Sequence, residues 1–164
     1  MAKIHLICGP VGAGKTTFAA KLTGETGAIH FAIDEWMTSL FTPDLDGDIE
    51  YDWAMTRIGR AEGLIWSHVR QLMKINVDAV LDLGLLQLVH RQKFYDLAQE
   101  DGFDICLYLV DADRETRWQR VEGRNRDKGA TYSMEVDRGM FDFCENLFER
   151  PEGDELKITI CHSS

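Results

Sequence analysis

Residues 3–16 read KIHLICGPVGAGKT, and this stretch sets the fold class. A short apolar run passes without a gap into GPVGAGKT at 9–16, which matches the pattern G-x-x-x-x-G-K-[ST]. That pattern forms a phosphate-binding loop when it follows a strand and opens a helix. The flanking residues meet this condition, because 3–8 is a strand-like apolar run and apolar residues recur at helical spacing over 15–23.

A loop of this kind predicts the binding of ATP together with Mg²⁺. Its glycines let the backbone curl, so that successive N–H groups and the start of the next helix face a phosphate. We expect Lys15 to reach the β and γ phosphates, Thr16 to hold Mg²⁺ and Thr17 to touch the α-phosphate. The residues expected to bind the nucleotide are therefore Gly9, Pro10, Val11, Gly12, Ala13, Gly14, Lys15, Thr16 and Thr17.

The rest of the chain alternates apolar runs with segments of helical spacing. We expect further strands at 28–33, 77–83, 104–110 and 156–161, and helices at 34–41, 53–74, 90–101, 113–126 and 134–149. This alternation predicts an α/β fold with a five-stranded parallel sheet covered by helices on both faces. Right-handed crossovers bring the carboxyl ends of the strands to one edge, where ligands bind. Residues 1–164 show no repeat or linker and are expected to form one domain.

The charge balance argues against a partner with many phosphates. The 164 residues carry a net charge of −10, with a sequence pI of about 4.9. A protein that grips long nucleic acid usually presents a basic face, so long nucleic acid is not an expected partner. No apolar run approaches the roughly 20 residues of a membrane span, so we expect no membrane association.

The four cysteines are Cys8, Cys106, Cys144 and Cys161, and their spacing matches no zinc-binding pattern. Three of them end apolar runs, where a thiol behaves as a small hydrophobic side chain. We therefore expect reduced cysteines in the core and a cytoplasmic protein.

Two carboxylates lie at the expected ends of strands. Asp34 follows the second strand, where it could act as a general base on an attacking hydroxyl or hold Mg²⁺ through water. The alternative is that Asp34 caps the helix over 35–41. Asp82 closes the third strand, where it could order the metal shell or bond loop N–H groups. Thr16 and Asp82 are the predicted metal-binding residues.

Arginines at 117, 120 and 124 fall at i, i+3 and i+7 of one predicted helix and so share a face. Folded over ATP, this face would neutralise charge on the transferring phosphoryl group. The alternative is a solvated face of ion pairs, since Asp113 lies four residues before Arg117. Arg120 and Arg124 have no acid at that spacing. The predicted catalytic set is Lys15, Asp34, Arg120 and Arg124, with Arg117 as a nucleotide ligand.

The segment 42–52 is expected to be a loop, with Asp52 capping the long helix that follows. It carries five alternating acids, which form either a solvated surface or a lid that attracts a cationic substrate. Arg57 and Arg60, in the first turns of that helix, either reach an anionic acceptor or pair with surface acids.

At these positions the chain resembles the small P-loop kinases related to zeta toxins, chloramphenicol phosphotransferase and polynucleotide-kinase-type phosphotransferases, which have an AAA-type ATP-binding domain. The likeness rests on GPVGAGKT at 9–16, FAIDEWM at 31–37, VLDLG at 80–84 and RWQRVEGRNR at 117–126. It implies the strand order 2-3-1-4-5 and transfer of the ATP γ-phosphoryl group to a hydroxyl.

The resemblance also implies roles for single residues. Asp34 corresponds to an Asp that acts as base or substrate ligand, and Arg120 and Arg124 correspond to lid arginines. Arg150 and Pro151 fall where some relatives contact the adenine. Members differ widely in their acceptor, so the likeness names no substrate. The low pI and the acidic loop depart from the kinases of nucleic-acid ends.

We therefore expect an ATP-dependent phosphotransferase whose partner is a small-molecule hydroxyl acceptor, such as an antibiotic or a sugar-like compound. A kinase of nucleosides, nucleotides or nucleic-acid ends is the first alternative. An ATPase or nucleotide-dependent switch, which transfers phosphate only to water, is an alternative of another class.

Overall fold

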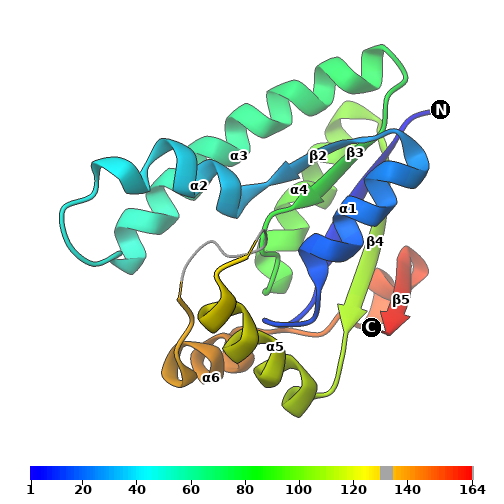
Figure 1. Ribbon diagram of the computed structural model, residues 1–164. Coiled ribbons are helices and arrows are strands. Elements are labelled where there is room, and N and C mark those ends of the chain that lie inside the picture. Colours follow the sequence, from blue (N-terminus) through cyan, green and yellow to red (C-terminus); the bar gives the residue numbers. More distant parts are fainter. Residues whose placement is uncertain (130–134, 164) are drawn as a thin grey trace.

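The computed structural model describes residues 1–129 and 135–163, and a parallel sheet runs through its centre (Figure 1). The strands are β1 (Lys3–Cys8), β2 (Ile29–Ala32), β3 (Ala79–Asp82), β4 (Asp104–Asp111) and β5 (Thr159–Ser163). Their order is β2-β3-β1-β4-β5, and every neighbouring pair is parallel. The predicted α/β fold class and strand order are confirmed.

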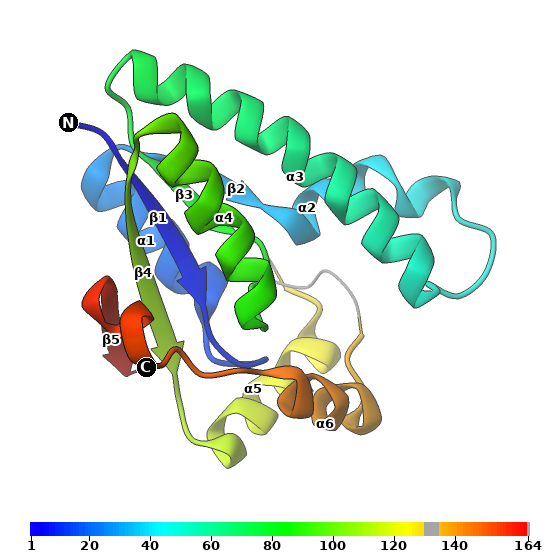
Figure 2. The same ribbon diagram turned by 180° about the vertical axis from the view of Figure 1, so that it is seen from behind.

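Helices cover both faces of this sheet (Figures 1 and 2). One face carries α1 (Lys15–Thr26), and the other carries α3 (Tyr51–Lys74) and α4 (Leu88–Asp101). The first turns of α3 project beyond the sheet together with α2 (Ile33–Leu40).

The remaining helical elements are shorter. A 3-10 turn, η1 (Thr42–Asp44), follows α2, and a second one, η2 (Gly153–Lys157), precedes β5. The helices α5 (Arg114–Asp127) and α6 (Arg138–Leu147) lie past the carboxyl end of β4. These two helices therefore stand at the edge where ligands are expected to bind.

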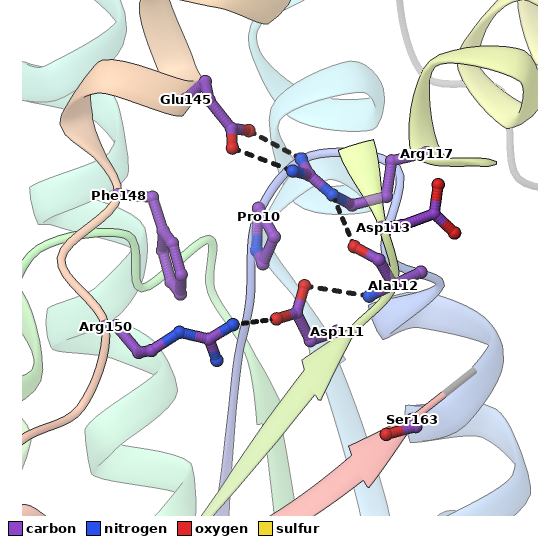
Figure 3. A pocket seen from close by; sticks show the side chains of 9 residues that line it. All are labelled: Pro10, Asp111, Ala112, Asp113, Arg117, Glu145, Phe148, Arg150 and Ser163. Atoms are coloured by element: carbon purple, nitrogen blue, oxygen red, sulfur yellow. Dashed lines mark hydrogen bonds and ion pairs between the residues drawn. The ribbon is translucent and has the colours of Figure 1, made fainter. Parts of the chain in front are cut away.

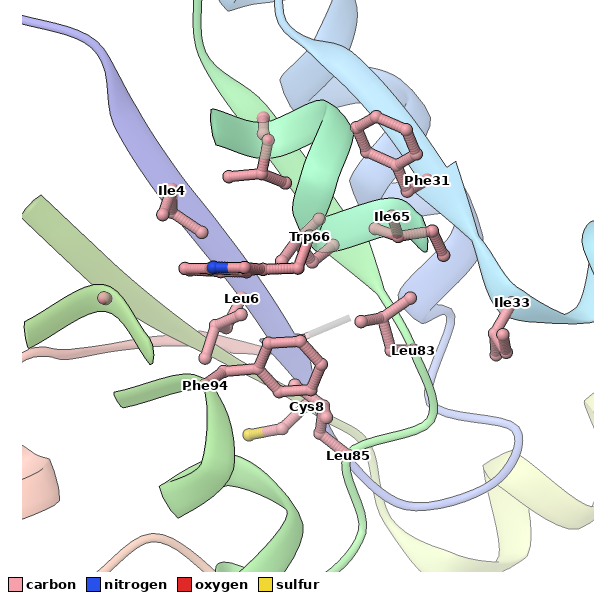
Figure 4. Packing of buried hydrophobic residues seen from close by; sticks show 14 of the residues in the cluster. Ile4, Leu6, Cys8, Phe31, Ile33, Ile65, Trp66, Leu83, Leu85 and Phe94 are labelled. Atoms are coloured by element: carbon pink, nitrogen blue, oxygen red, sulfur yellow. The ribbon is translucent and has the colours of Figure 1, made fainter. Parts of the chain in front are cut away.

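Residues 4–8 of β1 are all buried, and they enter two different cores because successive side chains of a strand point to opposite faces. Leu6 enters the larger core beneath α3 and α4, whereas Ile7 packs on the α1 face. Figure 4 shows Trp66 and Phe94 side by side in the larger core. The indole Nε1 of Trp66 donates to Asp101 Oδ2 at 2.9 Å, which satisfies its polar end. This core fixes α3 and α4 against the sheet.

Some predicted boundaries are wrong at the ends of elements. The helix α3 begins at Tyr51 after the cap residue Glu50, so Asp52 lies in the first turn and does not cap it. An acid there is still favourable, since it faces the positive end of the helix dipole. The last strand starts at Thr159, because 153–157 forms the 3-10 turn η2.

The helix predicted over 134–149 is shorter at both ends. It is α6, which begins at Arg138 after Asp137, whose side chain accepts the Met140 N–H at 2.7 Å. It ends at Leu147, and residue 134 lies outside the described residues. This capping hydrogen bond at Asp137 stabilises the first turn and so favours a helix that begins at Arg138.

All four cysteines are free thiols. Cys8 is buried, Cys106 and Cys144 are half-buried, and Cys161 is exposed. The prediction that the cysteines lie in the core is therefore wrong for Cys161, which sits on the edge strand β5. Within the described ranges, no helix has both the length and the apolar character needed to cross a membrane.

Candidate nucleotide-binding site

The predicted phosphate-binding loop connects β1 to α1 at the carboxyl edge of the sheet (Figure 1). At Gly9, φ is +149°, and a Cβ would lie 2.0 Å from the carbonyl oxygen of Val110 in β4. At Gly12, φ is +79°, and a Cβ would lie 2.5 Å from the carbonyl oxygen of Arg117 in α5. Both positions therefore need glycine, because the loop passes directly against β4 and α5.

The end of this loop prepares the start of α1. Gly14 is the N-cap residue of α1, with φ of +92°. As a glycine it makes no side-chain hydrogen bond to the first turn of the helix. The first N–H groups of α1 are therefore left for an anion. The Lys15 ammonium meanwhile donates to the carbonyl oxygens of Gly9 at 2.9 Å and Pro10 at 3.0 Å.

Lys15 lies among several charges. Burial lowers its pKa, the negative charges of Asp82 and Asp34 raise it in part, and the positive charge of Arg124 lowers it further. Charged residues from β3, α2 and α5 thus act on the ammonium group of Lys15 in α1. A phosphate at this point would stabilise the charged form of Lys15.

Thr16 and Asp82, the two predicted metal-binding residues, contact each other. The Thr16 hydroxyl donates to Asp82 Oδ2 at 2.8 Å, and Asp82 is buried. Hydroxyl and carboxylate oxygens are ligands of the kind that Mg²⁺ takes alongside phosphates and water. No cluster of three or more His, Cys, Asp or Glu side chains able to hold a metal occurs in the described residues. The hydroxyl and carboxylate oxygens of Thr16 and Asp82 are the donors that would fit an ion shared with a nucleotide.

Asp34 lies in the first turn of α2, directly after β2, with an exposed side chain. The N-cap of α2 is Ala32, so the alternative interpretation of Asp34 as the cap is wrong. Ala32 is the register partner of Asp82, so Asp34 follows the strand end beside Asp82. Its role as a base stays a prediction that this placement permits.

Arg117 is held by the protein itself. Its guanidinium donates to both carboxylate oxygens of Glu145, at 2.6 and 2.8 Å, and to the Val11 carbonyl at 3.2 Å. Asp113, the partner that helical spacing suggested, instead caps α5 by accepting the Thr116 N–H at 2.9 Å. Arg117 thus fastens α5 and α6 to the loop, and its contact with a nucleotide stays a prediction.

Arg120 and Arg124, the two arginines of α5 predicted to be catalytic, reach the same loop region. Arg120 Nη1 donates to the Ala13 carbonyl at 3.4 Å. The Nε atom of Arg124 is buried and has no hydrogen-bond partner in the part of the chain that is described. Buried donors are seldom left unpaired. An anionic ligand near Lys15 would supply the acceptor, which supports the predicted role of Arg124.

A cavity of about 730 Å³ opens beside the loop, between the end of β4 and the end of α6 (Figure 3). Phe148 and Arg150 lie on one side of it, Asp113 and Arg117 lie on the other, and Pro10 lies between them. This volume is within the range of small-molecule sites. The cavity is adjacent to the phosphate loop and therefore suits the nucleoside part of a nucleotide.

Only some of the residues that line this cavity could be predicted from the sequence. Arg150 lines the cavity, where it pairs with Asp111, but Pro151 is buried and is not among the lining residues. The sequence does not predict that Phe148 and Glu145 line this cavity, because no motif or helical spacing connects them to the loop. Glu145 lies 28 residues from Arg117, and only the packing of α6 on α5 brings the two together.

Arg57, one of the two candidate acceptor-binding arginines, packs on its own helix. Its guanidinium lies 3.9 Å from the centre of the Trp53 ring, and Nη1 donates to the Trp53 carbonyl at 3.1 Å. Arg60, one turn later, is exposed. Of the two alternatives for Arg57, pairing with surface acids is replaced in the structure by stacking on Trp53, and contact with an acceptor stays a prediction.

Residues 4–151 match a protein family described as an AAA domain. The chain belongs to this family. The match spans the phosphate loop, Asp82 and α5, and so includes the residues on which the resemblance to small P-loop kinases rested. That resemblance is confirmed at the level of the family and the P-loop fold.

One curated relative of this AAA-domain protein is the guanylate kinase of Novosphingobium aromaticivorans, at 26% identity over 152 residues. The match covers 82% of this chain and 66% of the kinase, so the chain spans about two thirds of that relative. Among solved structures, Chaetomium thermophilum Kti12 in complex with ADP-AlF3 has a TM-score of 0.73 at 14% identity, covering 98% of this chain and 88% of that one. A gluconokinase from Sinorhizobium meliloti 1021 has a TM-score of 0.65 at 12% identity, covering 99% and 82%. These structures show a shared fold.

Proposed function

We propose that this AAA-domain protein is an ATP-dependent phosphotransferase that moves the γ-phosphoryl group of ATP to a hydroxyl of a small molecule. The observation that carries the proposal is the grouping of Lys15, the Thr16–Asp82 pair and Asp34 at adjacent strand ends. Nucleotide binding alone accounts for the first three residues. The exposed carboxylate of Asp34 adds a proton acceptor beside them.

In the proposed reaction the acceptor oxygen bonds to the γ-phosphorus while the bond from that phosphorus to the β–γ bridging oxygen breaks. The hydroxyl proton passes to the Asp34 carboxylate, and ADP leaves with the electron pair of the broken bond. Lys15 exchanges its two carbonyl partners for phosphate oxygens. Arg120 and Arg124 stabilise charge on the transferring group.

Thr16 and Asp82 would hold Mg²⁺ in the loaded enzyme, where the ion neutralises charge on the β and γ phosphates. The Thr16 hydroxyl can donate its hydrogen to Asp82 and still offer an oxygen lone pair, because a hydroxyl both donates and accepts. The 2.8 Å bond between them therefore orients this oxygen before any ligand arrives.

A screen of hydroxyl-bearing metabolites and antibiotics, read as acceptor-dependent ADP formation, tests the proposal. Aminoglycosides belong in the screen, because the acidic segment 42–52 would attract cationic acceptors. Equal turnover of cationic and neutral acceptors would show that segment 42–52 does not select the acceptor by its charge. If no acceptor raised ADP formation above the rate with water, the ATPase alternative would replace the phosphotransferase.

The similarity to a guanylate kinase favours one second candidate, a kinase whose acceptor is a nucleotide. Arg57 and Arg60 would then bind the anionic acceptor. A double variant, Arg57→Ala with Arg60→Ala, should abolish acceptor binding in calorimetry while leaving ATP binding intact. Arg70→Ala is the matched control, since Arg70 lies on the same helix and pairs with Asp101 at 2.7 Å. Equal acceptor affinity in the double variant and the control would exclude this candidate.

A further inference from the structure

A histidine on the edge strand β2 lies close to the Thr16–Asp82 pair. His30 lies on β2, next to β3, and its side chain is 21% exposed. Its Nε2 atom is buried and, within the described residues, has no hydrogen-bond partner. That atom lies 3.8 Å from Asp82 Oδ2. A polar atom buried without a partner is unfavourable, so packing alone does not explain a histidine here.

The sheet register places His30 and Asp82 on the same face. His30 pairs with Val80 and Ala32 pairs with Asp82, and residues two apart on a strand share a face. That face is the one covered by α1, which carries Thr16. His30 and Thr16 therefore approach the Asp82 carboxylate from two different elements.

The Asp82 carboxylate has capacity for a second donor. Its Oδ2 accepts the Thr16 hydroxyl at 2.8 Å, and a carboxylate oxygen has two lone pairs. The 3.8 Å separation from His30 Nε2 exceeds a normal N–H···O distance by about 0.9 Å. A small side-chain rotation is enough to close this gap. The hydrogen then belongs on Nε2, because a bare nitrogen lone pair would repel the carboxylate.

We propose that His30 is a positioning residue for the Thr16–Asp82 pair, donating Nε2–H to Asp82 when nucleotide binds with Mg²⁺. This inference rests on the proposed function only in requiring a magnesium nucleotide at the loop. His30 restrains Asp82, and Asp82 in turn orients the Thr16 hydroxyl. Partners behind a metal ligand commonly act in this way, and their loss weakens metal affinity or activity by about 10- to 100-fold.

The test compares ADP binding with and without Mg²⁺ by isothermal titration calorimetry. His30→Leu fills much of the space of the ring without a donor, whereas His30→Gln supplies an N–H donor. We expect equal ADP affinity in the absence of Mg²⁺ for both variants and the wild type. The gain in affinity that Mg²⁺ gives should fall about 10-fold in His30→Leu and recover at least in part in His30→Gln. An unchanged gain in His30→Leu would overturn the inference.

His5→Leu is the matched control. His5 is also a strand histidine, and it pairs with Asp78 at 2.9 Å near the amino end of β3, away from the loop. Its replacement should lower stability and leave the Mg²⁺ gain unchanged. An equal loss of the gain in His5→Leu would overturn the inference, since general destabilisation would then explain both. Should His30→Leu fail to fold, His30→Met carries the same prediction with a more adaptable side chain.

The two proposals fail in different ways. If Mg²⁺ gave the wild type no gain in ADP affinity, the proposed function would fail, and the role of His30 with it. If the wild type showed the gain and His30→Leu kept it, only the role of His30 would be refuted.

Discussion

Gly12→Ala should destabilise the protein more than the same substitution at a comparable glycine elsewhere. Gly12 has φ of +79°, and its added Cβ would meet the Arg117 carbonyl oxygen at 2.5 Å. The left-handed conformation alone costs a non-glycine residue about 1–2 kcal/mol. Forcing the loop away from α5 adds about 1–3 kcal/mol, a typical cost of overpacking. The free energy of unfolding should therefore fall by about 2–5 kcal/mol in total.

Gly102→Ala is the control that separates these two contributions. Gly102 has φ of +70°, and a Cβ there would meet no atom within 4 Å. It should lose only the conformational part, about 1–2 kcal/mol, in urea unfolding followed by circular dichroism. Gly12→Ala should also weaken ATP binding in calorimetry, whereas Gly102→Ala should not. Equal losses of stability in the two variants would refute the close approach of the loop to α5.

Two further substitutions examine α5 and its partners. Glu145→Gln should lower stability by about 1–3 kcal/mol at pH 7, because it weakens the bond to buried Arg117. Hydrogen bonding to Arg117 lowers the pKa of Glu145 below 4.5, so this stability is present above pH 4.5 and is lost as the pH falls further. The difference from the wild type in urea unfolding should therefore shrink below pH 4.5, and a constant difference down to pH 3 would contradict an ionic origin. Arg124→Gln should lower acceptor-dependent turnover about 100-fold, a larger loss than its effect on ATP affinity, and a loss confined to affinity would show that Arg124 is only a ligand.

The central part of the fold could be predicted from the sequence because local patterns specify it. The strand, glycine loop and helix over 3–26 form one continuous signal, and the alternation of apolar runs with helical spacing indicates the parallel sheet. The resemblance to small P-loop kinases implied that β1 and β3 are neighbours, which brings Thr16 and Asp82 to the same edge, but their hydrogen bond is seen only in the structure.

Contacts between distant elements could not be predicted in the same way. Glu145 competes with Asp113 for Arg117, and the outcome depends on how α6 packs against α5. The nearness of His30 to Asp82 depends on the register of β2 against β3, which no local spacing encodes. The ends of helices were also uncertain, because a single residue, such as Glu50 in place of Asp52, can begin the helix.

The most direct test of the proposed phosphoryl transfer is the rate of acceptor-dependent ADP formation by the variant Asp34→Asn. The variant keeps the size of the side chain and removes the proton acceptor beside the nucleotide site. ATP affinity measured by calorimetry should stay within about twofold of the wild type, since Asp34 is not expected to bind the nucleotide. Acceptor-dependent ADP formation should fall by about 10²- to 10⁴-fold, the usual contribution of a general base. Turnover near the wild-type rate would contradict the assignment of Asp34 and the reaction built on it.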